Sequence, residues 1–307
     1  MKRARLIYNP SSGKEAGRKR LADILIALEE AGYEASAFAT QKKDDATKEA
    51  ERASDAGFDL IVAAGGDGTV YEVINGMAKK DNRPKLGILP FGTSNDFARA
   101  LGISKENFQE SLDVLKADIT QKVDVGKMNQ RYFINIAGGG SLTELTYEVP
   151  SKLKTVFGQL AYYIKGIEKV AQFKPYQIRA NIDGKFIEEE IMLFLVSNTN
   201  VVGGFDKLAP FADYTDGMFD VLMLRKCNVA ELGRVMSRLI NGEHIHDPKV
   251  LHYRAKKIDI IPSKNIQINL DGELGGIAPC YFEVLPQHLE VIVNNKYVSP
   301  QLDNEKK

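Results

Sequence analysis

One short segment constrains the fold of this chain more than any other. Leu60–Ala64 is an uninterrupted apolar run without polar alternation, and Gly65-Gly66-Asp67-Gly68-Thr69 follows it directly. A strand of this kind is typical of a parallel sheet that helices cover on both faces. The next residues, Thr69–Ala78, are expected to form a helix. The order of strand, glycine turn and helix predicts an open, doubly wound α/β domain.

The flanking sequence alternates in the same manner up to Asp124 and then changes character. In the first part we expect strands at Arg5–Tyr8, Glu34–Ala39, Leu60–Ala64 and Lys85–Leu89, and helices at Arg18–Ala31, Asp45–Ala56, Thr69–Ala78 and Asn95–Ala100. Short strands with turn signals follow, and we expect them at Tyr132–Ala137, Ile178–Asp183, Phe186–Ser197, Met218–Leu224, Lys257–Ile261, Ile266–Leu270 and Phe282–Leu285, with a hairpin turn at Asp183-Gly184. Helical segments interrupt them at Leu153–Ala171 and Val229–Ile240.

This pattern predicts two domains. Residues 1–124 form the α/β domain, residues 125–288 form a mostly antiparallel β-sandwich, and a strand at Leu289–Val293, in the stretch 289–300, returns to the first domain. A chain of 307 residues also exceeds the size at which a single core usually stops growing, which favours two domains.

Composition excludes several classes of protein. The formal net charge is +0, which argues against a general nucleic-acid binder. No apolar run approaches the roughly 18 residues of a membrane span. The two cysteines, Cys227 and Cys280, are too few for a disulfide framework and indicate reduced thiols in a cytoplasmic protein. Gly242–Pro248 contains two histidines, but its spacing suits an exposed connection rather than a zinc site.

Three glycine-bearing loops follow predicted strands of the α/β domain. In Gly65–Thr69, glycines let a phosphate approach the backbone, and the amides at the start of the next helix face the anion. The loop does not have the Walker A pattern. It is not a Rossmann fingerprint either, because Tyr71 stands where the third glycine of that fingerprint would fall. Taken alone, it is also compatible with a plain strand-to-helix turn.

The second loop is Pro90–Asp96, and the third is Asn9–Lys14, which continues into Arg18-Lys19-Arg20. Ligands of open α/β sheets bind at the carboxyl ends of strands, where all three loops are expected. Basic residues at a helix start oppose the helix dipole, so the cluster suggests an external anion such as a nucleotide phosphate. A solvated basic face is the alternative.

These motifs together resemble the diacylglycerol kinase catalytic-domain family, including the soluble bacterial diacylglycerol kinases. The residues that support the resemblance are Asn9–Gly13, Gly65–Thr69 with Glu72, Pro90-Phe91-Gly92-Thr93-Ser94-Asn95-Asp96-Phe97-Ala98-Arg99, Asp213-Tyr214-Thr215-Asp216-Gly217, and Asp271-Gly272-Glu273. The Gly-Gly-Asp-Gly-Thr motif is shared with nicotinamide-dinucleotide and sphingosine kinases, whereas the Pro90–Arg99 stretch is more specific to lipid kinases. Tyr71 departs from the family, which usually has Asn at that position.

The resemblance implies a Rossmann-like (phosphofructokinase-like) nucleotide domain followed by a β-sandwich lipid domain, with ATP between them. It transfers nucleotide contacts to Asn9, Pro10, Ser11, Ser12, Gly13, Thr40, Gly66, Asp67, Gly68, Thr69, Val70, Tyr71, Glu72 and Thr93, to which we add Lys14 and Lys19 of the basic cluster. Asp67 is expected to orient the catalytic Mg2+ and the phosphates. Asp96, Asp124 and Lys165 are expected to complete a charge network around that metal.

Two motifs of the second domain gain a role only through the resemblance. By itself, Asp213–Gly217 is an Asx turn and Asp271-Gly272-Glu273 is a hairpin turn. The family implies a structural Mg2+ held by Asp213, Asp216 and the backbone carbonyl of Met218. It also implies that Glu273 is the general base, with Asp271 beside it in the catalytic set.

The function expected from the resemblance is ATP- and Mg2+-dependent phosphorylation of diacylglycerol to phosphatidic acid. A kinase for another hydroxylated lipid or for NAD, or a catalytically silent lipid- or nucleotide-binding regulator, remains an alternative. Lys152–Ala171 is a basic amphipathic segment that is either buried core or a contact for anionic lipid headgroups. We expect a cytoplasmic homodimer that binds peripherally at the inner face of the membrane.

Overall fold

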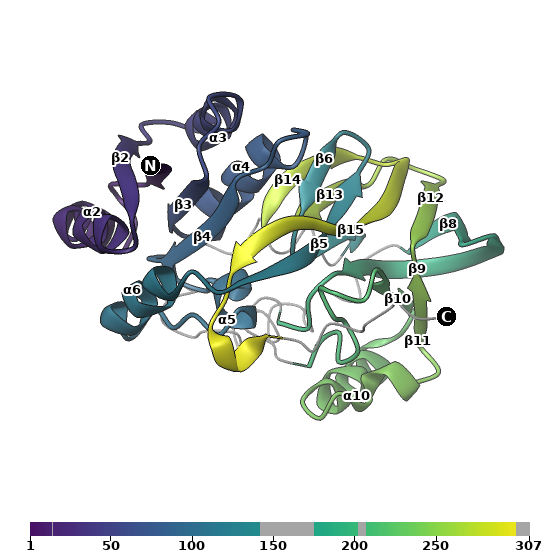
Figure 1. The fold of residues 1–307 in the computed structure, drawn as a ribbon. Coiled ribbons are helices and arrows are strands. Elements are labelled where there is room, and N and C mark those ends of the chain that lie inside the picture. The colour runs from purple at the N-terminus through teal and green to yellow at the C-terminus, as the bar shows by residue number, and fades with distance from the viewer. Residues whose placement is uncertain (14, 142–174, 202–206, 299–307) are drawn as a thin grey trace, which may run out of the picture. The chain divides into compact units, whose positions relative to one another are not determined.

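The computed structural model describes residues 1–13, 15–141, 175–201 and 207–298. The chain divides into two compact units, namely Met1–Asp124 with the chain from Pro286 onward, and Val125–Leu285. The division falls within two long strands, β5 (Thr120–Met128) and β15 (Cys280–Ile292). In Figure 1 the first unit comprises the purple and blue elements with the yellow end of the chain.

The first unit is built on a parallel sheet in the order β15-β4-β3-β1-β2. Its remaining strands are β1 (Lys2–Tyr8), β2 (Tyr33–Ala39), β3 (Leu60–Gly65) and β4 (Lys85–Pro90). Its helices are α1 (Ala16–Lys19), α2 (Leu21–Glu30), α3 (Asp45–Asp55), α4 (Asp67–Met77), α5 (Asp96–Ala100) and α6 (Phe108–Ala117). All six residues of β3 are buried, so the predicted doubly covered strand is confirmed.

The direction of chain winding reverses between β1 and β3. From β1 the chain passes through α2 to β2 on one side, and then through α3 to β3 on the other side of β1. Right-handed crossovers in opposite directions place α2 and α3 on opposite faces of the sheet. Accordingly α2 contacts α6, whereas α3 packs against α4. Such a reversal is the switch point at which open α/β sheets bind ligands.

The predicted helix Arg18–Ala31 is divided at Arg20 into α1 and α2. Arg18 and Lys19 therefore lie in the last turn of α1, where the helix dipole favours basic side chains. The premise that these basic residues stand at a helix start was therefore wrong, whereas the external anion near Lys14 and Lys19 stays a prediction. The cation of Arg20 instead lies 4.9 Å from the centre of the Phe108 ring, on α6, a helix that the sequence reading did not anticipate.

The second unit is an antiparallel sandwich in which strands pair in the order β14-β13-β7-β9-β8-β12-β15, and β9 also pairs with β10. Its strands are β6 (Arg131–Phe133), β7 (Ile136–Gly139), β8 (Tyr176–Ile182), β9 (Lys185–Ser197), β10 (Phe219–Arg225), β11 (Val250–Ala255), β12 (Lys257–Pro262), β13 (Gln267–Leu270) and β14 (Glu273–Ile277), with helix α10 (Val229–Leu239). Four phenylalanines form its centre: Phe133 lies 5.5 Å from Phe219 and 6.2 Å from Phe282, and Phe194 lies 6.3 Å from Phe282 between ring centres.

Several details of this unit differ from expectation. The two strands expected at Phe282–Leu285 and Leu289–Val293 are one continuous strand, β15. The segment Gly242–Pro248 is not an exposed connection, because it forms a 3-10 helix at Glu243–His246 in which His244 is buried. The predicted turn at Asp183-Gly184 is confirmed, with positive φ at both residues. The helix expected at Leu153–Ala171 lies outside the described residues.

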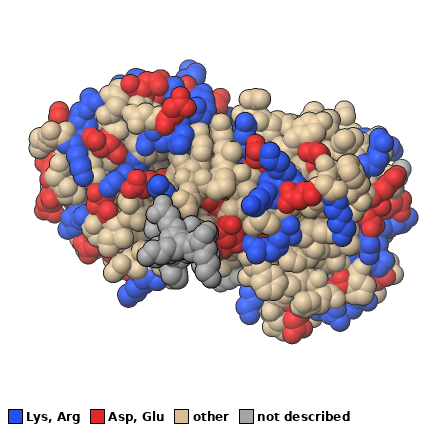
Figure 2. All heavy atoms as spheres, turned by 45° about the vertical axis from the view of Figure 1, so that its right-hand side comes forward, with Lys and Arg blue, Asp and Glu red and all other residues tan. Residues whose placement is uncertain are grey.

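Charged side chains of both signs are interspersed over the face drawn in Figure 2, in keeping with the net charge of +0. Among the helices in the described ranges, none has the length and apolarity to cross a bilayer.

Candidate functional site

Three loops meet at the switch point of the first unit. They are Asn9–Gly13 after β1, Gly65–Thr69 after β3, and Pro90–Asp96 after β4. The Asn9 amide donates to the Ala64 carbonyl at 3.0 Å, and the Phe91 amide donates to the Gly65 carbonyl at 2.8 Å. Backbone hydrogen bonds therefore join each loop to the strand or loop beside it, and residues from three parts of the sequence form one surface.

Glycines permit these loops to touch. A Cβ at Gly92 would lie 2.5 Å from the Gly66 Cα, and a Cβ at Gly66 would lie 3.2 Å from the Gly92 Cα. At Gly13, which has a φ of +57°, a Cβ would lie 2.6 Å from the Phe91 carbonyl oxygen. Side chains are excluded where the loops meet, so backbone amides are left as the groups that face a ligand there.

Asp67 joins the Gly65–Thr69 loop to the Pro90–Asp96 loop. As the first residue of α4, it accepts the Asn95 amide on Oδ2 and the Asp96 amide on Oδ1, both at 2.9 Å. Asn95 itself has a φ of +51°. Its side-chain Oδ1 accepts the Gly92 amide and its Nδ2 donates to the Gly92 carbonyl, both at 2.9 Å. Each Asp67 oxygen retains a lone pair beyond these bonds, because a carboxylate oxygen can accept twice.

Glu72 connects α4 to the segment that contains Thr40. Its Oε1 accepts the Asp44 amide at 3.0 Å and its Oε2 accepts the Ala46 amide at 3.1 Å, at the start of α3. Thr47 donates its hydroxyl to the Glu72 carbonyl at 2.9 Å. The Thr40 amide donates to the Tyr8 carbonyl at 2.9 Å, which places Thr40 at the end of β1. The carboxylate of Glu72 thus fixes this segment through backbone hydrogen bonds.

The other predicted residues of the first unit occupy varied surroundings. Asn9 accepts the amide and the hydroxyl of Ser11, at 3.0 and 2.8 Å, and so closes the Asn9–Gly13 loop. Thr93 accepts a Lys105 hydrogen bond on its carbonyl. Tyr71 is buried on α4, and the fully buried Asp124 accepts the Gln287 amide at 2.7 Å. Lys14 and Lys165 lie outside the described residues.

In the second unit, Asp271 and Glu273 lie at a tight hairpin. Asp271 and Gly272 both have positive φ and form the turn between Leu270 and Glu273. Leu270 of β13 and Glu273 of β14 are directly paired across the two antiparallel strands. The Asp271 carboxylate accepts the amides of Ile134, Asn135 and Ile136 at 2.7–2.9 Å. This carboxylate therefore anchors the hairpin to the connection between β6 and β7 and holds Glu273 at the start of β14.

The turn at Asp213–Gly217 presents oxygen atoms of two carboxylates. Asp213 Oδ1 accepts the Thr215 amide at 2.9 Å, Asp216 Oδ1 accepts the Met218 amide at 2.9 Å, and Arg254 pairs with Asp216 Oδ2. Burial raises the pKa of the Asp216 carboxyl, and the negative charge of Asp213 raises it further, although Arg254 acts in the opposite direction. The described residues contain no cluster of three or more metal-binding side chains.

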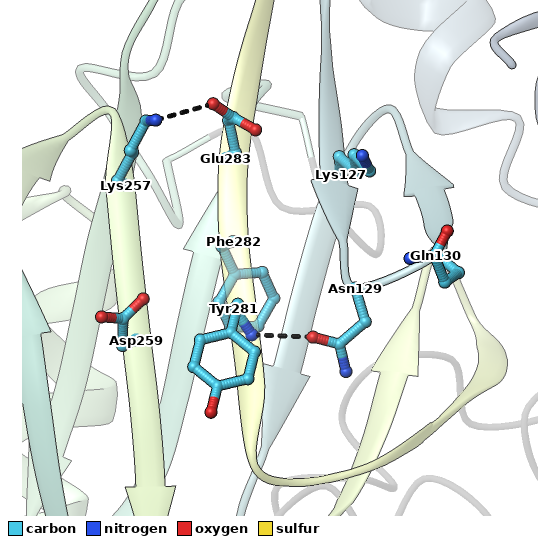
Figure 3. Close-up of a pocket in the computed structure, with 8 residues that line it drawn as sticks. All are labelled: Lys127, Asn129, Gln130, Lys257, Asp259, Tyr281, Phe282 and Glu283. Carbon is cyan, nitrogen blue, oxygen red and sulfur yellow. Dashed lines mark hydrogen bonds and ion pairs between the residues drawn. The ribbon is translucent and has the colours of Figure 1, made fainter.

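The second unit also has a hollow on its sheet, and none of its lining residues is a predicted site residue. Its volume is about 470 Å³, and it lies over β5, β12 and β15 (Figure 3). Its lining residues are Lys127, Asn129, Gln130, Lys257, Asp259, Tyr281, Phe282 and Glu283.

Sequence reasoning missed two residues that shape these loops. Asn95 was placed in the Pro90–Asp96 loop and the Pro90–Arg99 motif without a role of its own, whereas its side chain closes that loop on Gly92. Lys105 holds the Thr93 carbonyl from 12 residues away, and no local pattern indicates that contact.

Comparison with known proteins adds independent information. Residues 3–128 match the diacylglycerol kinase catalytic domain, and residues 145–293 match the YegS C-terminal NAD kinase beta sandwich-like domain. A Bacillus subtilis (strain 168) diacylglycerol kinase is 51% identical over 304 residues, which cover 99% of this chain and 100% of that protein. A Staphylococcus aureus (strain JH9) diacylglycerol kinase is 50% identical over 303 residues, which cover 99% and 96%. A solved diacylglycerol kinase structure from Bacillus anthracis (strain Sterne) has a TM-score of 0.82 at 29% identity and covers 97% of this chain and 99% of that one.

Proposed function

This chain belongs to the diacylglycerol kinase family, and on that premise we propose that it transfers the γ-phosphoryl group of ATP to the hydroxyl of diacylglycerol, giving phosphatidic acid. The observation that supports this proposal best is the contact of Gly66 with Gly92 at the switch point. It leaves a surface of backbone amides where an open α/β sheet binds its ligand. A triphosphate is the anion that such a surface suits.

The nucleotide would occupy the loops of the first unit. Amides at the start of α4 would face the phosphates, with Asn9–Gly13 on one side and Thr40 and Thr93 nearby. Asp67 and Glu72 would act mainly by holding these loops, since each of their carboxylate oxygens already accepts a backbone amide. Lys14 and Lys19 would add positive charge beside the phosphates.

Two cation sites belong to the proposal. Asp67 keeps spare lone pairs and suits a Mg2+ ion bound together with ATP, directly or through water. Such an ion would neutralise charge on the phosphate oxygens. The charge network of Asp96, Asp124 and Lys165 would surround it. Asp213 and Asp216 offer the oxygen ligands that Mg2+ prefers, with the Met218 carbonyl as a third.

Glu273 would serve as the general base. As the lipid hydroxyl oxygen bonds to the γ-phosphorus, the bond from phosphorus to the bridging oxygen breaks and ADP leaves. The hydroxyl proton passes to the Glu273 carboxylate. Asp271, with its three amide contacts, would fix the backbone that presents Glu273 rather than touch the substrate.

The substrate implies the setting in which the enzyme works. Diacylglycerol resides in membranes, so the protein would act peripherally at the cytoplasmic face of the membrane. Anionic headgroups would attract its basic residues.

An acceptor panel tests the proposal. Diacylglycerol, sphingosine, monoacylglycerol and NAD are each incubated with the purified chain, Mg2+ and labelled ATP, and the lipids are presented in mixed micelles with anionic lipid. We expect label predominantly in phosphatidic acid. NAD is the second candidate, because residues 145–293 match a sandwich domain described as NAD kinase-like. Label in NAD alone would support that alternative, and no labelled acceptor would support a silent regulator.

A further inference from the structure

Three segments that are distant in the sequence meet at one end of the sandwich in the second unit. They are the Asp271-Gly272-Glu273 hairpin, the β6–β7 connection (Ile134–Asn135), and Asn198 and Thr199, which follow β9. β7 is antiparallel to β9, so the start of β7 lies beside the end of β9. β13 pairs with β7 on its other side, which brings the hairpin to the same place.

The two residues after β9 hold the carbonyl groups of the connection. Asn198 Nδ2 donates to the Ile134 carbonyl at 2.8 Å, and the Asn198 amide donates to the Asn135 carbonyl at 2.8 Å. The Thr199 amide donates to the Asn135 carbonyl at 3.3 Å. The Thr199 hydroxyl donates to the Asn135 Oδ1 at 3.1 Å. Both the backbone and the side chain of the connection are therefore fixed by these two residues.

The amide groups of the connection hold the hairpin. The amides of Ile134 and Asn135 donate to the Asp271 carboxylate at 2.7 and 2.9 Å. Each residue of the connection is thus bonded on one edge to Asp271 and on the other edge to the residues after β9. A displacement of Asn198 or Thr199 would be passed to Asp271, and from there to Glu273, two residues further along the chain.

These hydrogen bonds lie out of contact with water. Asn198 and Thr199 are both 0% exposed, and Asn135 is 5% exposed. A buried polar network that is paired in this way fixes one arrangement of the segments that it joins. Ser197 provides a contrast, because it is also 0% exposed, yet no hydrogen-bond partner for its hydroxyl is found within the described part of the chain.

On the premise that Glu273 is the general base of the proposed function, we propose that Asn198 and Thr199 are positioning residues for this carboxylate. They act through the β6–β7 connection and Asp271, without contact with the substrate. A base must lie within hydrogen-bond distance of the proton that it accepts. A displacement of about 1 Å can lower the rate about 100-fold. Loss of the network therefore slows phosphoryl transfer and leaves ATP binding by the first unit unchanged.

A matched pair of variants at Thr199 tests the proposal. Thr199→Val removes the hydroxyl and keeps the branched shape, whereas Thr199→Ser keeps the hydroxyl. In single turnovers with labelled ATP and diacylglycerol in mixed micelles, Thr199→Val should transfer phosphate at least about 10-fold more slowly, with unchanged affinity for ATP. Thr199→Ser should retain the wild-type rate to within about 3-fold. The control Ser197→Ala removes the neighbouring buried hydroxyl and should also behave as the wild type.

Asn198→Asp replaces the Nδ2 donor by an oxygen and should slow transfer in the same way as Thr199→Val. Circular dichroism verifies that the variants are folded, and Thr199→Val carries the test if Asn198→Asp is not. A wild-type transfer rate in Thr199→Val overturns the proposal. Equal slowing in Thr199→Val and Thr199→Ser also overturns it, because the hydroxyl would then have no part in the effect.

A double-mutant cycle with Glu273→Gln separates positioning of the base from a general structural effect. If Thr199 acts through Glu273, Thr199→Val should slow the wild-type chain and have little further effect in the Glu273→Gln background. Equal slowing in both backgrounds overturns the positioning role and leaves the proposed function intact. A Glu273→Gln variant that transfers phosphate at the wild-type rate refutes the base itself, and the positioning role with it.

Discussion

Replacing Gly92 by alanine probes the Gly66–Gly92 contact on which the proposed nucleotide-binding loops depend. The new Cβ would lie 2.5 Å from the Gly66 Cα and 2.8 Å from the Asn95 Oδ1. Carbon atoms of different residues normally approach to about 3.5–4.0 Å, so the two loops must separate by roughly 1 Å. Overpacking of this kind costs about 1–3 kcal/mol of folding free energy. A displacement of about 1 Å in a positioned phosphate can lower the rate about 100-fold.

Urea unfolding and steady-state kinetics with ATP would measure both effects. We expect a lower unfolding midpoint and a kcat/KM reduced by about two orders of magnitude. Gly233→Ala is the control, because a Cβ at Gly233 meets no atom within 4 Å and the residue lies inside α10. That variant should gain about 0.5–1 kcal/mol and keep its kinetics. If Gly92→Ala unfolds and turns over like the wild type, the steric reasoning is refuted.

Three further predictions concern other parts of the chain. Asp271→Ala should lose about 2–4 kcal/mol of stability in urea, because three backbone amides lose their acceptor; a loss below about 0.5 kcal/mol would contradict the anchoring role. Hydrogen bonds from Arg234, above all, lower the pKa of Asp247 to about 2. Because the unfolded value is near 3.9, its stabilising contribution should be complete above roughly pH 5 and should fall as pH drops toward 2. Stability measured against pH in Asp247→Asn should lack that component, and an unchanged acid profile would count against it. Burial raises the pKa of both Cys227 and Cys280, so neither thiol should react with a thiol reagent at pH 8 until urea is added; rapid labelling of the native chain would disprove this.

Local sequence patterns were sufficient to predict much of the secondary structure of the first unit. The apolar run at Leu60–Ala64 needs no tertiary information, because only a doubly covered strand buries every residue in succession. The break at Arg20 escaped prediction, since helical periodicity continues through it. α6 was missed although Asn107 caps it by accepting the Glu110 amide, a signal that was present in the sequence.

The second unit was harder to predict because pairing between distant strands decides its details. β14 contains Gly275-Gly276, which locally favour a turn, and it becomes a strand only through its pairing with β13. The two strands expected around Pro286 are one, since β15 pairs with β12 at its start and with β4 near its end. The catalytic role that the family resemblance gives to Asp271 stays a prediction, whereas its contacts with the β6–β7 connection depend on tertiary pairing and could not be predicted from local motifs.

The most direct test is a single-turnover measurement with labelled ATP and diacylglycerol in mixed micelles, comparing the wild-type chain with Glu273→Gln. Phosphatidic acid should acquire label in the wild type, whereas Glu273→Gln should bind ATP with unchanged affinity and transfer its phosphate at least about 100-fold more slowly. Equal transfer rates in the two proteins would contradict the role of Glu273 as the base, and a wild type that binds no ATP would contradict the nucleotide site itself.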